Sequence, residues 1–538
     1  MGKGLLVSSA LLLVAAAPAG ADSFNQFGFH TPGTAVGIPD LKFEAVSDDG
    51  AHVFFSTPEA IPGTGDTDNA VDIYESVGGQ VILRSLGQNG TGNTNGSPVS
   101  FSDISADGTK IAFTTNEQLV QLDGANTGDE DNARDVYWKN FVNGNVRHVS
   151  RGAGDLADDP AFPATFEAMT DDGSRLFYST LESHEAGDTD GARDIYRSQP
   201  QNFITTGYTT FTNGAQGVTF NATNEGGAAD KLVFSTRERI GIQDAVDSNR
   251  DVFRVTNASG TDVENVSQSS QPDEAVDNDF EGATPSLEDI AFSSEETIFA
   301  SEDSDGGAKD IWVWPGFSGV GTQRSGPAAS TATSTFRDIS DDGETVFLQT
   351  AGSWAGADDL DGFSDIYADS GGAPTLISRT TPANDVVYGD SSGDGTRVWF
   401  RTGTSLAASD GDGADDIYEA ATAAPSAPAH VSVGTNGGGT SNFEHASADG
   451  TRVTFSTPDK VTADDPDTTS DLHQRAGGLT YRVSRGPQEL GTGHALLPGG
   501  GMTPDGLQAV FLTTEKMFAS DTDNAVDLFS ATARAGSG

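Results

Sequence analysis

Short stretches in which hydrophobic and polar positions alternate recur along the chain, each directly after an Asp-Gly pair. Val53 and Phe55 follow one such pair, and Ile111 and Phe113 follow the next. A period of two predicts β-strands that bury one preferred face. Asp-Gly favours a tight hairpin turn, because glycine accepts positive φ. The turn recurs at residues 47–50, 105–108, 170–173, 340–343, 392–395, 447–450 and 503–506.

A second pattern, Asp followed by an aliphatic and then usually an aromatic residue, marks another strand in every unit. Its nine aspartates are Asp72, Asp135, Asp194, Asp251, Asp310, Asp365, Asp416, Asp471 and Asp527. Successive members lie 51 to 63 residues apart, which indicates an internal repeat. A short strand precedes each turn, as at 99–104, and a fourth strand follows a glycine-rich turn, as at 78–83. Each unit is therefore predicted to be four antiparallel strands.

Four-stranded units of this size are typical of the blades of a β-propeller. We expect one all-β domain over residues 22–538, a single propeller of about nine four-stranded antiparallel blades. Eight blades with one unit displaced, or two smaller rings, fit the same repeat. The last unit stops after its third strand. We expect the N-terminal segment between Asn25 and Leu41 to supply the missing strand and to close the ring, which removes the exposed edge.

The repeat as a whole has the form S-x-D-G-x-x-[VI]-x-F, then [IV]-Y, a glycine turn and V-S. This pattern resembles the TolB-type (WD-like) β-propeller repeat of exported bacterial proteins. The resemblance covers nearly the whole chain after residue 21 and implies the fold, but says little about function. The proline that usually follows the turn serine in that family is present only as Pro504, and the loop before the third strand is more acidic than usual.

The N-terminus has the features of a secretory signal peptide. Lys3 precedes an apolar run over residues 5–17, and Ala19-Gly-Ala21 has the form of a cleavage site. We expect residues 1–21 to be removed and the protein to be secreted, either extracellular or periplasmic. The chain has no cysteine, which excludes disulfides and cysteine-based metal or nucleophile sites. No later apolar run reaches the roughly 18 residues that a membrane span needs.

The chain is strongly acidic, with a formal net charge of -51 and a pI near 4.1. This charge argues against nucleic acid and anionic membrane surfaces as partners. Divalent cations, basic proteins or a high-salt environment are the natural counterparts of such a surface.

Seven of the nine units carry the pattern D-x-D-x-x-x-D before the third strand. The residues are Asp66, Asp68 and Asp72; Asp129, Asp131 and Asp135; Asp188, Asp190 and Asp194; Asp359, Asp361 and Asp365; Asp410, Asp412 and Asp416; Asp465, Asp467 and Asp471; and Asp521, Asp523 and Asp527. Three carboxylates in seven residues repel one another unless a cation or water screens them. Loops of this kind supply the hard oxygen ligands of calcium. We therefore predict calcium in several loops, the alternative being that these aspartates cap loop backbone on a solvated face.

The acidic loop is similar to the D-x-D-x-D-G-x-x-D-[LI] calcium loop of FG-GAP propellers. Aligned on its end, this chain keeps the third, fifth and ninth positions of that loop. The first ligand is missing, since Thr64, Ala186, Ala357, Ala408 and Ala463 stand there. Units four and five carry Ala245 and Ser304 within the pattern, so we expect no metal in those units.

The sequence favours a binding role over catalysis. Residues 389–393 match G-x-S-x-G, but a nucleophile elbow needs a turn from strand to helix. His473 occupies the aromatic position of its strand and is predicted to pack there. The first hypothesis is a secreted, non-catalytic propeller that binds a protein or glycan on one face and is stabilised by calcium. The alternatives are a propeller-fold polysaccharide lyase or hydrolase, for which the many aspartates identify no single catalytic pair, and a structural surface-layer protein.

Overall fold

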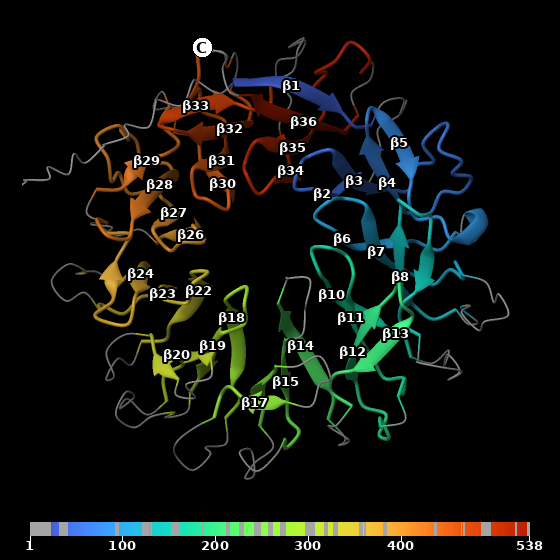
Figure 1. Ribbon diagram of the computed structural model, residues 1–538. Helices are drawn as coiled ribbons and strands as arrows, with labels where there is room; N and C mark the ends of the chain where they lie inside the picture. The colour runs from blue at the N-terminus through green and yellow to red at the C-terminus, as the bar shows by residue number, and fades with distance from the viewer. Residues whose placement is uncertain are drawn as a thin grey trace, which may run out of the picture.

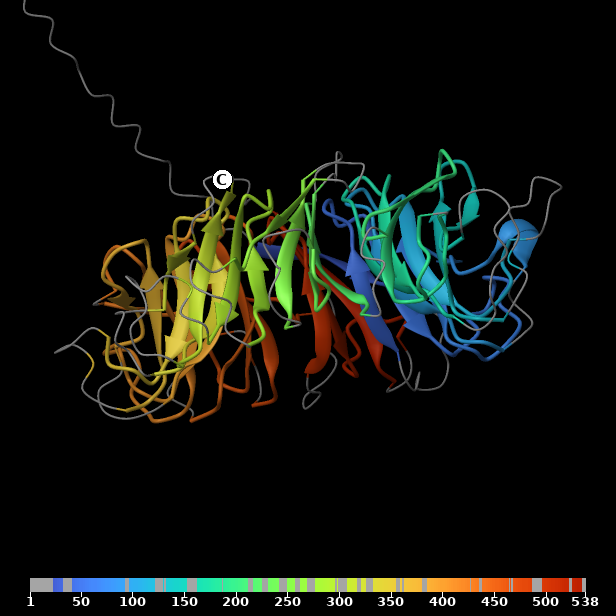
Figure 2. The same cartoon turned by 90° about the horizontal axis from the view of Figure 1, so that it is seen from below.

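Each four-strand unit of the sequence forms one antiparallel sheet, and nine such sheets stand around a common centre in the computed structural model (Figure 1). Seen from the side, the sheets stand next to one another in a disc (Figure 2). The prediction of a single nine-bladed propeller is confirmed, and the alternatives of eight blades or two rings are wrong. The structure describes residues 23–31, 41–91, 96–120, 129, 132–151, 162–185, 187–210, 216–224, 231–240, 249–256, 262–268, 276–295, 298, 307–316, 321–325, 332–354, 359, 362–379, 385–425, 427–434, 438–463, 465, 468–485, 496–521 and 525–534.

The two inner strands of each blade flank the position of the first turn, which is Asp-Gly in seven of the nine units. The innermost strands are β2 (Lys42–Val46), β6 (Ser100–Ile104), β10 (Thr165–Met169), β14 (Val218–Thr223), β18 (Asp279–Ala283), β22 (Thr335–Ile339), β26 (Val387–Ser391), β30 (Asn442–Ala446) and β34 (Leu496–Met502). The second strands are β3 (His52–Thr57), β7 (Lys110–Thr115), β11 (Leu176–Thr180), β15 (Leu232–Thr236), β19 (Asp289–Ser294), β23 (Val346–Thr350), β27 (Arg397–Thr402), β31 (Arg452–Thr457) and β35 (Gln508–Thr513).

Every third strand begins at the aspartate of the second sequence pattern. These strands are β4 (Asp72–Val77), β8 (Asp135–Asn140), β12 (Asp194–Gln199), β16 (Asp251–Val255), β20 (Asp310–Pro315), β24 (Asp365–Asp369), β28 (Asp416–Ala421), β32 (Asp471–Ala476) and β36 (Asp527–Arg534). The outermost strands are β5 (Gln80–Leu83), β9 (Val146–His148), β13 (Ile204–Gly207), β17 (Val263–Asn265), β21 (Thr322–Gln323), β25 (Thr375–Leu376), β29 (Ala429–His430), β33 (Leu479–Arg482) and β1 (Ser23–Phe29).

The N-terminal strand closes the ring, as the missing fourth strand predicts. β1 pairs antiparallel with β36, and the last sheet has the order β1-β36-β35-β34. Gly28 lies opposite Ser530 in this pair. The last blade is thus built from both ends of the chain, so that opening it requires breaking contacts between residues about 500 positions apart.

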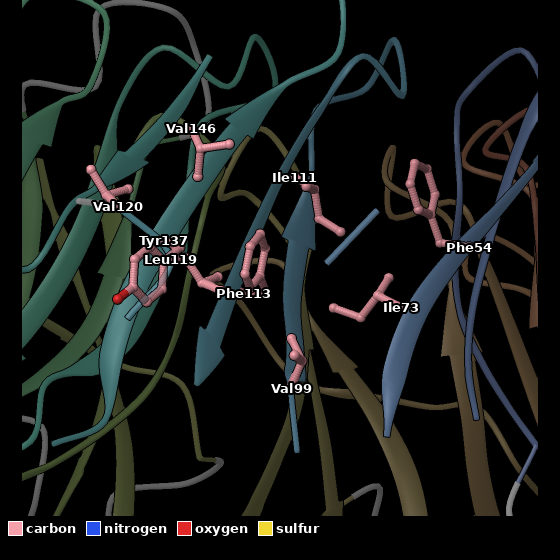
Figure 3. Packing of buried hydrophobic residues seen from close by; sticks show 9 residues of the cluster. All are labelled: Phe54, Ile73, Val99, Ile111, Phe113, Leu119, Val120, Tyr137 and Val146. Atoms are coloured by element: carbon pink, nitrogen blue, oxygen red, sulfur yellow. The ribbon is translucent and has the colours of Figure 1, made fainter. Parts of the chain in front are cut away.

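The hydrophobic core lies between neighbouring blades. Phe54 and Ile73 of the first blade pack against Ile111, Phe113 and Tyr137 of the second in one such cluster (Figure 3). The expectation that the second strands bury one preferred face is wrong, because β3 is buried at every residue from Val53 to Thr57. Blades cover this strand on both sides, so its polar-looking positions are buried as well. Each fully buried large apolar side chain contributes roughly 1.5–3 kcal/mol.

The Asp-Gly turns lie together on one face of the ring. The backbone N–H of Asp48 donates to the Ala106 carbonyl in the next blade at 2.9 Å, and the Ala106 N–H donates to the Asp171 carbonyl at 2.7 Å. Gly50 and its counterparts adopt positive φ in these turns, and in the fifth blade Leu287 takes the same conformation with φ of 53°. The turn is therefore kept in a blade whose sequence lacks Asp-Gly.

Helical structure is nearly absent from the part of the chain that the structure describes. One 3-10 turn, η1 (Gln88–Gly90), follows the outermost strand of the first blade. No helix among these residues is long and apolar enough to cross a membrane.

Candidate metal centres

The acidic loops connect the second and third strands of the blades. Because the strands of every blade alternate in direction, these loops share one face of the ring, and the Asp-Gly turns occupy the other. The candidate ligands therefore form a circle of separate loops. Each loop is anchored at the blade by its third aspartate, which is also the first residue of the third strand.

A hydroxyl from the end of the outermost strand holds the third aspartate in all nine blades. In the third blade the Thr209 hydroxyl donates to Asp194 at 2.6 Å and accepts the Ile195 N–H at 2.8 Å. The equivalent hydroxyls belong to Ser85, Ser150, Ser267, Ser325, Ser378, Ser432, Ser484 and, in the closing blade, Thr31. One oxygen of each aspartate is thereby occupied, and the carboxylate orientation is the same from blade to blade.

The first aspartate of the loop contacts the tyrosine of the third strand. The Tyr196 hydroxyl donates to Asp188 Oδ2 at 2.6 Å, and burial raises the pKa of Tyr196, so that the hydroxyl keeps its proton. Equivalent bonds join Tyr74 to Asp66, Tyr137 to Asp129, Tyr367 to Asp359 and Tyr418 to Asp410.

The middle aspartate of the loop accepts backbone N–H groups from the turn that follows it. Asp68 Oδ1 accepts the Ala70 N–H at 2.8 Å, and Asp412 Oδ1 accepts the Ala414 N–H at 2.8 Å. Asp190 Oδ1 accepts the N–H groups of Gly191 and Ala192, both at 2.6 Å. Asp412 also accepts the Gly438 N–H through its Oδ2 at 3.3 Å, whereas the caps made by Asp68 and Asp190 each use one carboxylate oxygen.

Three of the seven predicted triads converge. In each of them one carboxylate oxygen from every aspartate lies within 4.8 Å of the others. The converging triads are Asp66, Asp68 and Asp72; Asp188, Asp190 and Asp194; and Asp410, Asp412 and Asp416. In the other four loops the middle residue lies outside the described residues, namely Asp131, Asp361, Asp467 and Asp523. Ala245 and Ser304 of units four and five lie outside them too.

The charge of the triads in the first and third blades is poorly compensated by the residues that the structure describes. Burial raises the pKa of Asp194 to about 7, and the charges of Asp188 and Asp190 add to the effect. Burial, with the charges of its two loop partners, raises the pKa of Asp72 to about 6. Asp188 is 5% exposed, and its Oδ1 has no hydrogen-bond partner among the described residues. A buried carboxylate oxygen without a partner is costly, and a calcium ion fits such a set of hard oxygens.

The eighth blade supplies a cation of its own. Arg482 lies opposite the third-strand position of His473, and its Nε is 3.1 Å from Asp471 Oδ1. Burial alone would lower the pKa of Arg482, but Asp471 and two further carboxylates outweigh burial and raise it. The guanidinium thus balances an acidic loop from within the protein.

The residue opposite the third-strand aromatic differs among the other blades. His148 and His430 stand at this register position in the second and seventh blades, with Nε2 2.9 Å from Asp135 and 3.3 Å from Asp416, respectively. The first and third blades carry Leu83 and Gly207 there. The loops of these two blades therefore combine a converged triad with a non-basic residue at this position.

Another carboxylate pair lies on the innermost strands, where the sequence did not single it out. Asp338 of β22 accepts the hydroxyl of Ser391 and lies 3.4 Å from the Tyr388 hydroxyl on the neighbouring β26. Burial and the charge of Asp338 raise the pKa of Asp390 to about 6. The sequence signal that could have identified this pair is its place in the repeat. Asp338 and Asp390 stand directly after the β-bulge of the innermost strand, where several other units have alanine, as at Ala45. Ser391, the centre of the G-x-S-x-G match, ends β26 before an Asp-Gly turn rather than a helix.

His473 packs as predicted. It is fully buried and stacks on Phe455 with ring centroids 5.6 Å apart. It therefore takes the place of the tyrosine, phenylalanine or tryptophan that the other blades bury at this position.

Comparisons with known proteins bear on the fold alone. No protein-family model matches the chain, and no curated protein matches it. Among solved structures, a prolyl endopeptidase is 12% identical over 80% of this chain, with a TM-score of 0.36, and this chain covers 55% of its length. The β-propeller domain of the Trilobed protease from Pyrococcus furiosus is 12% identical, covering 71% of this chain and 97% of that one with a TM-score of 0.32.

TolB from Acinetobacter baumannii also matches, as the repeat pattern predicts. It is 12% identical over 70% of this chain and 80% of that chain, with a TM-score of 0.25. Likenesses this remote carry no argument about activity, and the chain spans only about half the length of the prolyl endopeptidase. The blade count rests on the strand pairing itself. The chain is a nine-bladed β-propeller, and its repeat pattern resembles that of TolB.

Proposed function

We propose that this protein is a secreted, non-catalytic β-propeller that binds a glycan or a protein on one face and is stabilised by calcium in its acidic loops. Secretion is supported by the signal-peptide pattern of residues 1–21, which lie outside the described residues. A binding role is supported by a chain that is almost entirely repeat, because binding surfaces are built on rigid scaffolds by loop variation.

One observation carries the calcium proposal. In the third blade Asp188, Asp190 and Asp194 converge, and the buried Asp188 Oδ1 has no hydrogen-bond partner in the described part of the chain. Calcium takes six to eight oxygen ligands, which this triad would share with loop carbonyls and water. The ion would neutralise charges that otherwise oppose folding.

Thermal unfolding tests this proposal. Millimolar calcium should raise the melting temperature and a chelator should lower it, because a ligand that binds only the folded state adds roughly 2.7 kcal/mol per site at a hundredfold excess over its Kd. Sodium chloride at matched ionic strength controls for screening. The double variant Asp190→Asn, Asp194→Asn should show a smaller calcium effect. Asp465→Asn is the matched control, because Arg482 already balances that loop, and its calcium effect should equal that of the wild type.

Two outcomes would contradict the calcium proposal. Sodium chloride could reproduce the entire effect of calcium, which would make the loops a solvated acidic face. Alternatively, the double variant could keep the full calcium effect of the wild type, which would place any bound ion elsewhere.

A polysaccharide hydrolase is the second candidate, and the Asp338–Asp390 pair is what favours it. Glycoside hydrolysis uses two carboxyl groups, one of them protonated near neutral pH. Asp390, with a pKa raised to about 6 by burial, fits the acid role beside Asp338. Reducing-sugar release from a polysaccharide panel tests this candidate. Activity that Asp390→Asn abolishes would favour the hydrolase, and a panel without turnover would leave the binding role.

A further inference from the structure

A cavity of about 630 Å³ lies between the second and third blades. Phe101 of β6 and Phe166 of β10 line it, together with Ser102, Thr114, Asn116 and Arg134. The lining combines two aromatic side chains with hydroxyl, amide and guanidinium groups. Small-ligand sites combine apolar side chains with polar groups that fix the orientation of the ligand.

Arg134 differs from its counterparts in the following blades. The residue just before the third strand is basic in four consecutive blades, and three of the four have partners. Arg193 donates to the Ser179 hydroxyl at 3.0 Å, Arg250 pairs with Asp279, and Lys309 lies 3.2 Å from Asp279. The guanidinium of Arg134 is exposed and has no hydrogen bond or ion pair with any other described residue. Within the described part of this chain of net charge -51, it therefore presents a positive charge at the cavity that no other side chain pairs with.

Comparison with the other blades shows which side chain could pair with Arg134 and is absent from the second blade. A β-bulge follows the aromatic residue of the innermost strand, and the bulged residue is Glu44, Glu167, Glu281 or Glu444 in the first, third, fifth and eighth blades. In the fifth blade this glutamate lies 3.7 Å from Lys309. The second blade has Ser102 instead. A carboxylate present in four other blades is thus replaced at the cavity by a small hydroxyl.

We infer that this cavity binds an acidic sugar residue, a uronate, whose carboxylate takes the place of the missing glutamate on Arg134. Arginine pairs with carboxylates through two parallel hydrogen bonds. Phe101 and Phe166 offer apolar contact to a pyranose ring, and the polar side chains of Ser102, Thr114 and Asn116 offer hydrogen bonds to its hydroxyls. These hydroxyl and amide groups favour a sugar over an acidic peptide. The inference rests on the proposed binding function and names the class of glycan.

Calorimetric titration with a galacturonic acid trisaccharide tests the site. The full-length protein should bind this trisaccharide at physiological ionic strength, and a neutral galactose trisaccharide should not bind. Arg134→Gln should weaken binding about 10- to 100-fold, the loss expected for a charge-assisted hydrogen bond. Lys309→Gln, at the same repeat position three blades away, should leave the affinity unchanged.

A second variant tests the same site while Arg134 is retained. Ser102→Glu restores the repeat glutamate, which should pair with Arg134 and abolish binding while the melting temperature is retained. The site is overturned if the wild type does not bind the acidic trisaccharide, if Arg134→Gln binds it equally well, or if a glutamate hexapeptide binds more tightly. Calcium-dependent melting of the same samples separates the two proposals, because it depends on the acidic loops and not on Arg134.

Discussion

The seam where the ring closes should be sensitive to acid, because a buried histidine spans it. His30 follows the closing strand, and its Nδ1 and Nε2 each lie 2.8 Å from a serine hydroxyl, Ser76 in the first blade and Ser530 in the last. Gly28 leaves room for this contact, since a Cβ there would lie 2.6 Å from the Ser530 oxygen. Among the described residues, the ring nitrogens of His30 contact only the two hydroxyls.

The magnitude follows from the burial of the ring. Burial lowers the pKa of His30 from 6.5 to about 4, and each pKa unit corresponds to about 1.4 kcal/mol. The neutral ring is therefore favoured in the closed state by about 3 kcal/mol. This stabilisation is fully present above pH 6.5 and is lost as the pH falls toward 4. At pH 5 the closed seam should have lost about 2 kcal/mol relative to pH 8.

Hydrogen exchange of the amides in β1 and β36 measures this opening directly. After correction for intrinsic rates, protection in the wild type should fall about 30-fold between pH 8 and pH 5. His30→Gln cannot titrate in this range, so its protection should change much less with pH. Amides of β15, in the fourth blade, serve as the internal reference. Equal pH dependence in wild type and variant would refute the role of His30.

Three further predictions concern the repeat itself. Removing residues 23–31 should lower the melting temperature markedly, since the last blade loses its outermost strand, and an unchanged melting curve would contradict ring closure. Gly108→Ala should lower the free energy of unfolding more than Gly78→Ala does. Both glycines have positive φ, but their surroundings differ. A Cβ at Gly108 would lie 2.6 Å from a side-chain carbon of the neighbouring blade, whereas a Cβ at Gly78 would meet nothing within 4 Å. We expect about 1 kcal/mol for Gly78 and roughly 2–3 kcal/mol for Gly108, and equal losses in denaturant titrations would argue against the close packing. Ser85→Ala removes the hydroxyl that holds Asp72 and should lower the free energy of unfolding by about 1–3 kcal/mol. Ser85→Thr should keep the stability of the wild type, because two blades use threonine at this position. A threonine variant as unstable as the alanine variant would contradict the role of the hydroxyl.

The repeat could be predicted from the sequence because its signals are local. The start of each third strand coincides with an aspartate, such as Asp72, and the closing strand follows from a unit that is one strand short. The expectation of a single buried face failed for a reason that is not local. Residues from Val53 to Thr57 are buried on both sides by the neighbouring blades, and a period of two in one strand does not reveal how many sheets cover it.

The candidate site was predictable in its ligands but not in its surroundings. The spacing of Asp188, Asp190 and Asp194 indicated a cation loop, and their convergence accords with it. The hydroxyl of Thr209 and the guanidinium of Arg482 reach such loops from other strands, so their roles emerge only in three dimensions. The open partner position of Arg134 likewise required the register of the blades to be compared.

Counting bound calcium tests the central claim most directly. Equilibrium dialysis of the purified protein, at matched sodium chloride, should show more than one calcium ion per chain, held by the loops around Asp66–Asp72 and Asp188–Asp194. The double variant Asp190→Asn, Asp194→Asn should bind one ion fewer, and Asp465→Asn should bind as many as the wild type. Two results would contradict a calcium-stabilised propeller. In the first, the calcium concentrations of the protein and buffer chambers become equal once sodium chloride screens the protein charge. In the second, the double variant binds as many ions as the wild type.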